Sequence, residues 1–244
     1  AGNFNLTNSA EHFAQLLEYG LDPVGASDTQ VLLERLGYFL DREHDHLHAT
    51  MGPGSLWNLE GRQLADEVSR ELNLVRVLQK AAASWDGGYH LAGILGNGDA
   101  FACRDPSGIR PAYFHIDDEV VAVASERAAL SNVFDVPAEQ IEPVRPGCAL
   151  VVKRDGRITQ EAFCEPREVK QCTFERIYFS RGNDPDICRE RKALGRLLAP
   201  RVYDAIDGDV DHAVFSFIPN TAETAYFGLV EQIGYLARED RVED

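Results

Sequence analysis

Two arginines flank a tight turn in the sequence CRDPSGIRPAYF, and charged groups at a turn can bind an anion or brace the backbone. Asp105 favours the first position of such a turn, Pro106 fixes φ at the second, and Gly108 suits the fourth. Arg104 and Arg110 stand on either side of it. Either these arginines are solvated, which is the commoner case, or they donate to carboxylates and carbonyls of the same domain.

Histidines alternate in EHDHLH, at His44, His46 and His48. An extended strand would bring all three to one face, as a zinc site can use. However, the preceding helix is expected to end near Asp41, and the segment leads into ATMGPGS. A solvated loop that holds no metal is therefore the preferred interpretation.

The cysteines are odd in number, scattered and without a C-x-x-C pair. This usage is typical of reduced thiols in a cytoplasmic protein. The five are Cys103, Cys148, Cys164, Cys172 and Cys188.

Composition describes an ordinary globular chain with a strong negative charge. Of its 244 residues, 44% are hydrophobic and 26% are charged, and the formal net charge is −16. We therefore expect no broad nucleic-acid or membrane surface, although a local phosphate site needs only a few amides and one or two basic groups. No apolar run approaches the length that spans a bilayer.

Helical patterns occupy the first third of the chain. Residues 3–6 read as the end of a strand, and a helix follows with Asn8 as its cap and Glu11 completing a capping box. Ser27 caps a second helix that buries Leu32, Leu36, Phe39 and Leu40. Helical periodicity returns from about residue 59 to residue 83.

From residue 87 the period changes to two. Three hairpins are predicted, turning at residues 96–98, 117–119 and 155–156. After Pro166 we expect an extended segment and loop at 173–186, then a helix with Leu194, Leu197 and Leu198 on one face. A buried strand near residues 212–219 and another helix would follow.

This order predicts an α+β fold, an antiparallel sheet layered with helices, followed by the start of an α/β domain. The division is placed at 1–167 and 168–244. One strand cannot close a parallel sheet, so we expect the chain to be a fragment of a longer protein.

Five ordered motifs carry a resemblance to a known family. RDPSGIRPAYF with VVAVASERAAL is similar to the RDP-x-G-I-R-P-L and ASE-x-x-AL signature of class II glutamine amidotransferases, which are N-terminal-nucleophile hydrolases with an αββα sandwich. GNFNLTN and SDTQVLL resemble that family's HNGNLTN and SDSE-x-LL. In the second part, CTFERIYFSRGNDPDI and VFSFIPNTAETA resemble segments of the amidophosphoribosyltransferases, the glutamine phosphoribosylpyrophosphate amidotransferases that open purine synthesis.

The resemblance implies roles for three residues in binding glutamine. Asn3 matches the asparagine whose side chain stabilises the oxyanion, and Asp28 matches the aspartate that holds the substrate ammonium. Phe4 stands where the family has a glycine whose backbone N–H completes the oxyanion hole, and phenylalanine resists a positive φ. From the residues alone, an asparagine before a helix is more often a turn or cap, and Asp28 more often favours its own helix N-terminus.

The resemblance assigns a scaffold role to the turn and the hairpin end. We expect Arg104, Asp105, Arg110 and Glu126 to form a braced polar cluster that holds the sheet and does not contact substrate. The full signature is Arg104, Asp105, Gly108, Arg110, Ser125 and Glu126.

Other parts of the family's machinery are expected outside these residues. The nucleophilic cysteine would lie upstream, so the chain as given is expected to be inactive. Mg²⁺ would accompany phosphoribosylpyrophosphate in the full enzyme, which we expect to be a homo-oligomer. Cys172 matches an iron–sulfur ligand of some relatives, but one cysteine cannot hold a cluster, and a buried thiol is expected.

Two alternatives stay open. The chain could belong to a class II amidotransferase that delivers ammonia to a different acceptor. It could also be a catalytically silent relative that serves in binding or assembly, which Phe4 and the SRGNDPD loop would favour.

Overall fold

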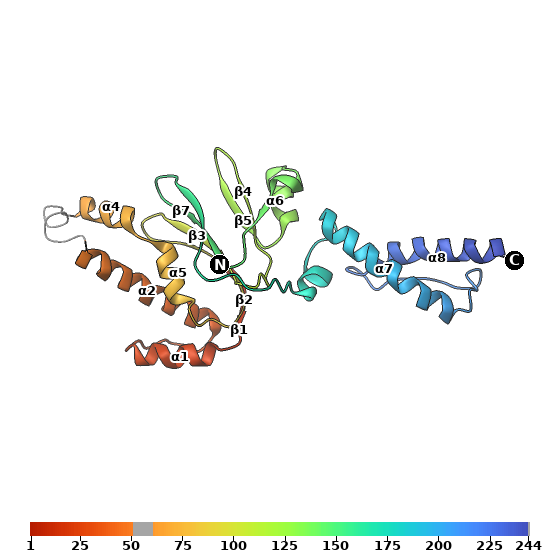
Figure 1. The fold of residues 1–244 in the computed structure, drawn as a ribbon, viewed down its shortest axis with the longest axis horizontal. Helices are drawn as coiled ribbons and strands as arrows, with labels where there is room; N and C mark the ends of the chain where they lie inside the picture. Colours follow the sequence, from red (N-terminus) through yellow and green to blue (C-terminus); the bar gives the residue numbers. More distant parts are fainter. Residues whose placement is uncertain (51–60, 244) are drawn as a thin grey trace. The chain divides into compact units, whose positions relative to one another are not determined.

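A computed structural model describes residues 1–50 and 61–243, which divide into two compact units (Figure 1). The first unit contains Ala1–Ser125 and Glu142–Gln171, and the second contains Glu126–Ile141 and Cys172–Asp244. The second unit thus includes Glu126–Ile141, which in chain order falls between the two segments of the first unit. The expected domains, 1–167 and 168–244, stay a prediction.

Four helices belong to the first unit. They are α1 (Ser9–Glu18), α2 (Asp28–Thr50), α4 (Arg62–Glu71) and α5 (Leu74–Ala81). The Ser27 cap is confirmed, because its Oγ accepts a hydrogen bond from Gln30 N at 3.3 Å. The single helical stretch predicted over residues 59–83 is interrupted at Leu72, and Asn73 caps α5 by accepting from Arg76 N. The first part of that stretch lies outside the described residues.

The histidine segment is helical, so its prediction as a loop is wrong. α2 continues nine residues past Asp41, as far as Thr50. In a helix His44 and His48 share a side one turn apart, whereas His46 points elsewhere. The one-sided row of three histidines that a strand would give is therefore absent from α2.

Two antiparallel sheets follow, and the three predicted hairpins are confirmed. The larger sheet has the order β1 (Gly2–Leu6), β2 (Gly87–Ile94), β3 (Ala100–Arg104), β7 (Cys148–Val152) and β8 (Ile158–Ala162). The smaller has the order β5 (Val121–Ala124), β4 (Tyr113–Ile116) and β6 (Glu142–Pro143). In Figure 1 the helices lie on one side of the larger sheet and the β4–β5 hairpin lies on the other.

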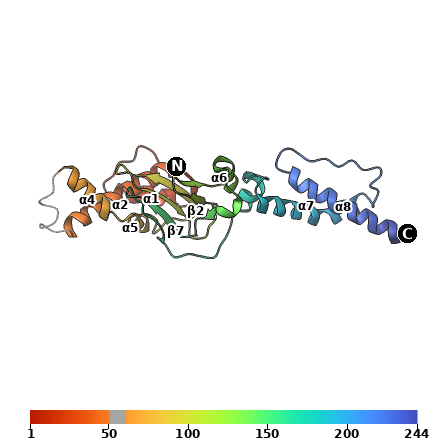
Figure 2. The same ribbon diagram turned by 90° about the horizontal axis from the view of Figure 1, so that it is seen from above.

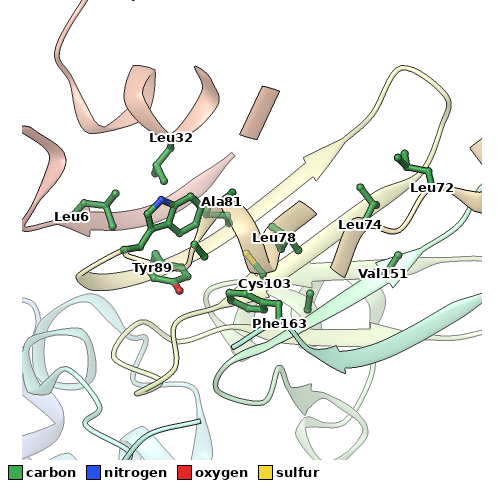
Figure 3. Packing of buried hydrophobic residues seen from close by; sticks show 14 of the residues in the cluster. Leu6, Leu32, Leu72, Leu74, Leu78, Ala81, Tyr89, Cys103, Val151 and Phe163 are labelled. Carbon is green, nitrogen blue, oxygen red and sulfur yellow. The ribbon is translucent and has the colours of Figure 1, made fainter. Parts of the chain in front are cut away.

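A continuous apolar core joins the helices to the larger sheet. Figure 3 shows Tyr89, Cys103 and Phe163 packed beneath Leu78 and Ala81 of α5. The other face of the sheet packs on the smaller sheet through a second cluster of Ala102, Ala112, Phe114, Val144 and Leu150. Because side chains alternate along a strand, β2, β3 and β7 contribute to both layers.

The second unit is helical in its described residues. It contains α6 (Arg127–Phe134), a 3₁₀ turn (Ala138–Gln140), a π-helical turn (Glu175–Phe179), α7 (Pro185–Ala205) and α8 (Glu223–Glu243). The extended segment predicted from residue 173 is thus wrong where the π-helical turn lies. None of the helices in the described ranges has the length and apolarity needed to cross a membrane.

The strand predicted near residues 212–219 does not form in the structure. Residues 213–218 carry no strand hydrogen bonds, and Val214 and Ile218 are 96% and 84% exposed. A strand exists only where a second strand pairs with it, and the described part of this unit contains no other strand. Residues 212–219 have the apolar pattern of a buried strand, but the described part of this unit contains no strand to pair with them.

One arginine ties the short segment of the second unit to α7. Arg127 donates to both carboxylate oxygens of Asp184, at 2.7 and 2.8 Å, and to Asp186 at 2.6 Å. Asp184 also caps α7 by accepting from the amides of Asp186 and Ile187. This bidentate pair explains why Glu126–Ile141 groups with the second unit.

Helices α7 and α8 lie side by side (Figure 2) and approach through glycine rather than leucine. A Cβ added at Gly228 would lie 2.1 Å from Lys192 O, and one at Gly195 would lie 1.8 Å from Ala225 O. Leu194, Leu197 and Leu198, the face predicted to be buried, are instead 46–76% exposed. Backbone contact at the two glycines sets the rotation of α7.

Gly228→Ala should therefore destabilise the second unit by roughly 1–3 kcal/mol, the usual cost of overpacking. Gly234→Ala is the matched control in the same helix, because no atom lies within 4 Å of its added Cβ. The control should gain about 0.5–1 kcal/mol from helix propensity. Thermal unfolding followed by circular dichroism measures both, and equal shifts would contradict the close approach of the helices.

Candidate functional site

Arg104 is a buried cation that holds the turn after β3. Its Nε donates to Arg110 O at 2.7 Å, Nη2 to Gly108 O at 2.9 Å, and Nη1 to Val144 O at 3.0 Å. The side chain is 7% exposed, and burial lowers its pKa below the ordinary value. A guanidinium out of water needs acceptors, and here carbonyls supply them.

Asp105 binds the same turn from its amide side. Its Oδ1 accepts from Ser107 N and Ile109 N, and Oδ2 accepts from Tyr89 N and Arg110 N, at 2.9–3.3 Å. The carboxylate is fully buried. The last residue of β3 and the residue after it thus bind amides and carbonyls of the same turn, residues 107–110.

Gly108 is required by this arrangement. Its φ is +59°, and an added Cβ would lie 3.0 Å from Pro146 Cγ and 3.2 Å from Arg104 Nη2. Glu126, the last member of the predicted cluster, belongs to the second unit, where its carboxylate is 3.8 Å from Arg181 Nε, so its part in the cluster stays a prediction. Ser125 is the last residue of the first unit's long segment.

Arg104 is also the last of three polar residues that lie side by side, as a polar row, on three neighbouring strands. The antiparallel registers place Asn3 opposite His90 and His90 opposite Arg104. Phe4 and Leu91 pack toward the helices, so alternation puts the three polar residues on the other face, toward the smaller sheet. The sequence motifs quoted above include Asn3 and Arg104 but not His90, which only the strand register reveals.

His90 is buried and neutral. Burial and the charge of Arg104 lower its pKa well below the ordinary value, against a backbone hydrogen bond to Pro111 that raises it. The ring is 6% exposed, and its Nε2 is buried without a hydrogen-bond partner among the described residues.

Phe4 adopts an ordinary extended conformation within β1. It pairs with Tyr89, and it is not among the described non-glycine residues with positive φ, which are Asp135 and Asp207. The conformational objection to a phenylalanine at this position therefore does not apply to this backbone.

Asp28 is the first residue of α2, and its Oδ1 accepts a hydrogen bond from Thr29 N at 2.8 Å. This carboxylate is thus directed at its own helix turn, although Oδ2 accepts no hydrogen bond among the described residues. β1 does pass this turn, because Gly2, Phe4 and Thr29 line one apolar groove of about 780 Å³.

The Asn3 side chain and Asp28 lie on different sides of the larger sheet. Asp28 begins the helix that covers the Phe4 face, whereas the Asn3 side chain projects from the opposite face of the same strand. β1 is the edge strand of its sheet. A ligand that touched both side chains would have to lie across this edge, so their joint role in one pocket stays a prediction.

A second cavity, of about 430 Å³, lies between the two sheets. Its lining includes Ala1, Ala92, Ala102, Val121 and Leu150. Ala92 and Ala102 share a strand face with His90 and Arg104. The polar row is therefore continued by an apolar hollow.

The NLTN segment, residues 5–8, makes structural hydrogen bonds that the sequence pattern does not predict. Asn8 precedes α1 but makes no capping hydrogen bond there, contrary to the predicted capping box. Its carboxamide instead donates to Ser84 O and accepts from Asp86 N, and Thr7 Oγ1 donates to Asp86. These bonds fasten the start of α1 to the loop before β2.

Two of the described cysteines have thiols with a raised pKa. Burial raises the pKa of Cys103 above its ordinary value and that of Cys164 to about 11. Cys172, expected to be buried, is partly exposed. No group of three or more His, Cys, Asp or Glu side chains in the described residues is arranged to hold a metal ion.

No protein-family model matches the chain. Curated relatives are amidophosphoribosyltransferases: that of Bacillus subtilis is 26% identical over 96% of this chain, and that of Archaeoglobus fulgidus is 24% identical over 96%. The Mycobacterium tuberculosis enzyme is 36% identical over 55% of it. The chain spans only 41%, 44% and 24% of these relatives' own lengths.

Solved structures show the same fold. The glutamine phosphoribosylpyrophosphate amidotransferase of B. subtilis, complexed with ADP and GMP, covers 96% of this chain with a TM-score of 0.60 and 22% identity. A structure described as the allosteric regulatory enzyme of purine biosynthesis gives a TM-score of 0.63 with 23% identity. The chain therefore shares the fold of these two structures. Its sequence is similar, over nearly its whole length, to part of the curated amidophosphoribosyltransferases.

Asp105→Asn should destabilise the first unit, because one amide oxygen cannot accept from all four backbone amides. Two buried N–H groups lose their acceptor, at roughly 1–3 kcal/mol each. Asp117→Asn is the control: Asp117 also accepts from two amides, Glu119 N and Val120 N, but through Oδ1 alone and at an exposed turn. Urea unfolding followed by the fluorescence of buried Trp85 measures both, and equal midpoints would contradict the four-amide arrangement.

Proposed function

We propose that this chain is part of a glutamine-dependent amidophosphoribosyltransferase, which hydrolyses glutamine and transfers the ammonia to phosphoribosylpyrophosphate to give phosphoribosylamine, the first step of purine biosynthesis. The observation that carries the proposal is the match to curated enzymes of that name over 96% of the chain. The shared fold and the buried Arg-Asp turn support it.

The first unit serves glutamine hydrolysis. Asn3 and the Phe4 N–H stabilise the oxyanion that forms when a thiolate attacks the substrate amide, because such a charge needs preorganised N–H donors. Asp28 accepts the substrate ammonium. The extended backbone at Phe4 and the position of Asp28 beside the groove edge support these assignments.

The second unit serves the acceptor. It belongs to the phosphoribosylpyrophosphate half of the enzyme, where Mg²⁺ accompanies the substrate, and the described residues offer no group of ligands to which that ion can be assigned. Action in the cytoplasm and assembly into a homo-oligomer complete the proposal.

The test is an assay of the full-length protein with glutamine and phosphoribosylpyrophosphate. Phosphoribosylpyrophosphate-dependent release of glutamate and pyrophosphate is the expected result. Glutamate release that responds to a different acceptor would point to another class II amidotransferase. A folded protein that consumes neither substrate would overturn the proposal in favour of a binding or assembly role.

In the full-length enzyme, Asp28→Asn should raise the KM for glutamine by on the order of tenfold or more while leaving ammonia-dependent synthesis unchanged, because only glutamine presents an ammonium to this carboxylate. Asp22→Asn, in the exposed loop before α2, is the control. Steady-state kinetics with both nitrogen donors measure the effect. Equal loss of the two activities would mean that Asp28 only supports its helix, as its bond to Thr29 N allows.

A further inference from the structure

His90 is a buried histidine with one nitrogen that has no partner. It lies in the middle of β2, is 6% exposed, and bonds the backbone of Pro111. Its Nε2 is buried without a hydrogen bond among the described residues. Such nitrogens are rare in folded proteins, so the neighbours of this one indicate its use.

The chemistry of the free nitrogen follows from the protonation of the ring. Burial and the positive charge of Arg104 lower the pKa of His90 well below its ordinary value, so the ring is neutral. A neutral imidazole has one N–H, and the carbonyl of Pro111 takes it. Nε2 therefore presents a lone pair and can only accept a hydrogen bond.

Asn3 is the neighbour that can donate to this lone pair. It lies directly opposite His90 in the β1–β2 ladder and on the same face, where opposite Cβ atoms are roughly 4.5–5.5 Å apart. The other neighbour in the row, Arg104, directs its Nε, Nη1 and Nη2 at backbone carbonyls. A carboxamide has two N–H groups, so Asn3 can serve two acceptors at once.

We propose that His90 is a positioning residue for Asn3: with glutamine bound, His90 Nε2 accepts one N–H of the Asn3 carboxamide and directs the other N–H at the oxyanion. This role rests on the proposed function. It also fixes which end of the carboxamide faces the substrate, because a flipped Asn3 would set its oxygen against the lone pair of His90.

The experiment uses the full-length protein and two substitutions at this position. His90→Phe keeps a ring but removes the acceptor, whereas His90→Gln can return an oxygen near the place of Nε2. His115→Phe is the control, because His115 is equally buried, at 6% exposed, but lies on β4 of the other sheet. Glutaminase kcat and KM, ammonia-dependent synthesis and Tm are measured for each.

His90→Phe should lower the glutaminase kcat by about 10–100-fold, as expected for a residue that orients a catalytic group, with little change in KM. Ammonia-dependent synthesis should be retained, His90→Gln should recover most of kcat, and His115→Phe should keep wild-type kcat.

Three results would overturn the role of His90 alone: an unchanged kcat in His90→Phe, an equal defect in His90→Gln, or equal loss of the ammonia-dependent reaction. A folded wild-type protein without glutaminase activity would overturn the proposed function itself, and this role with it.

Discussion

The pair Arg104–Asp105 fixes the backbone on which the rest of the first unit depends. Arg104 is the last residue of β3 and Asp105 follows it, and both side chains form hydrogen bonds to the same turn, residues 107–110. The Arg104 guanidinium donates to the carbonyls of Gly108 and Arg110, and the Asp105 carboxylate accepts from the amides of Ser107, Ile109 and Arg110. These bonds supply partners to backbone groups of a partly buried turn, where unpaired groups would be costly.

The two layers on either side of the larger sheet are packed differently, and β2 contributes side chains to both. On the helix side, Tyr89 and Leu91 join a large core under α2 and α5. On the other side, His90 and Ala92 face the smaller sheet, where packing is thinner and a cavity remains. A polar row can exist on this second side because the Arg104 guanidinium is hydrogen-bonded to the backbone carbonyls of Gly108, Arg110 and Val144. Its charge, in turn, helps to keep the neighbouring His90 neutral.

Local chemistry made parts of this fold predictable. The hairpins followed from glycine and aspartate at the reversals, since those residues determine the turn by themselves. The end of α2 was missed because nothing between Asp41 and Thr50 breaks a helix, and the first glycine and proline come at Gly52 and Pro53. The strand near residue 214 and the buried face of α7 depend on partners distant in sequence, and no local pattern reports those. The same holds for His90, whose surroundings come from three strands.

Under the proposed function, the edge position of β1 decides whether one substrate can contact both Asn3 and Asp28. A strand in the middle of the sheet would separate a residue on one face from a helix on the other by a full layer of backbone. At an edge, a ligand can contact the Asn3 face of the strand and the N-terminus of α2 on the other side without crossing the sheet. Phe4 then has a physical consequence beyond its extended φ: its ring packs on the helix side of β1 and lines the apolar groove there, together with Leu91 and Thr29. Under the proposed function, a substrate that contacts Asn3 from the other face of β1 would therefore have to extend around the strand edge to reach Asp28.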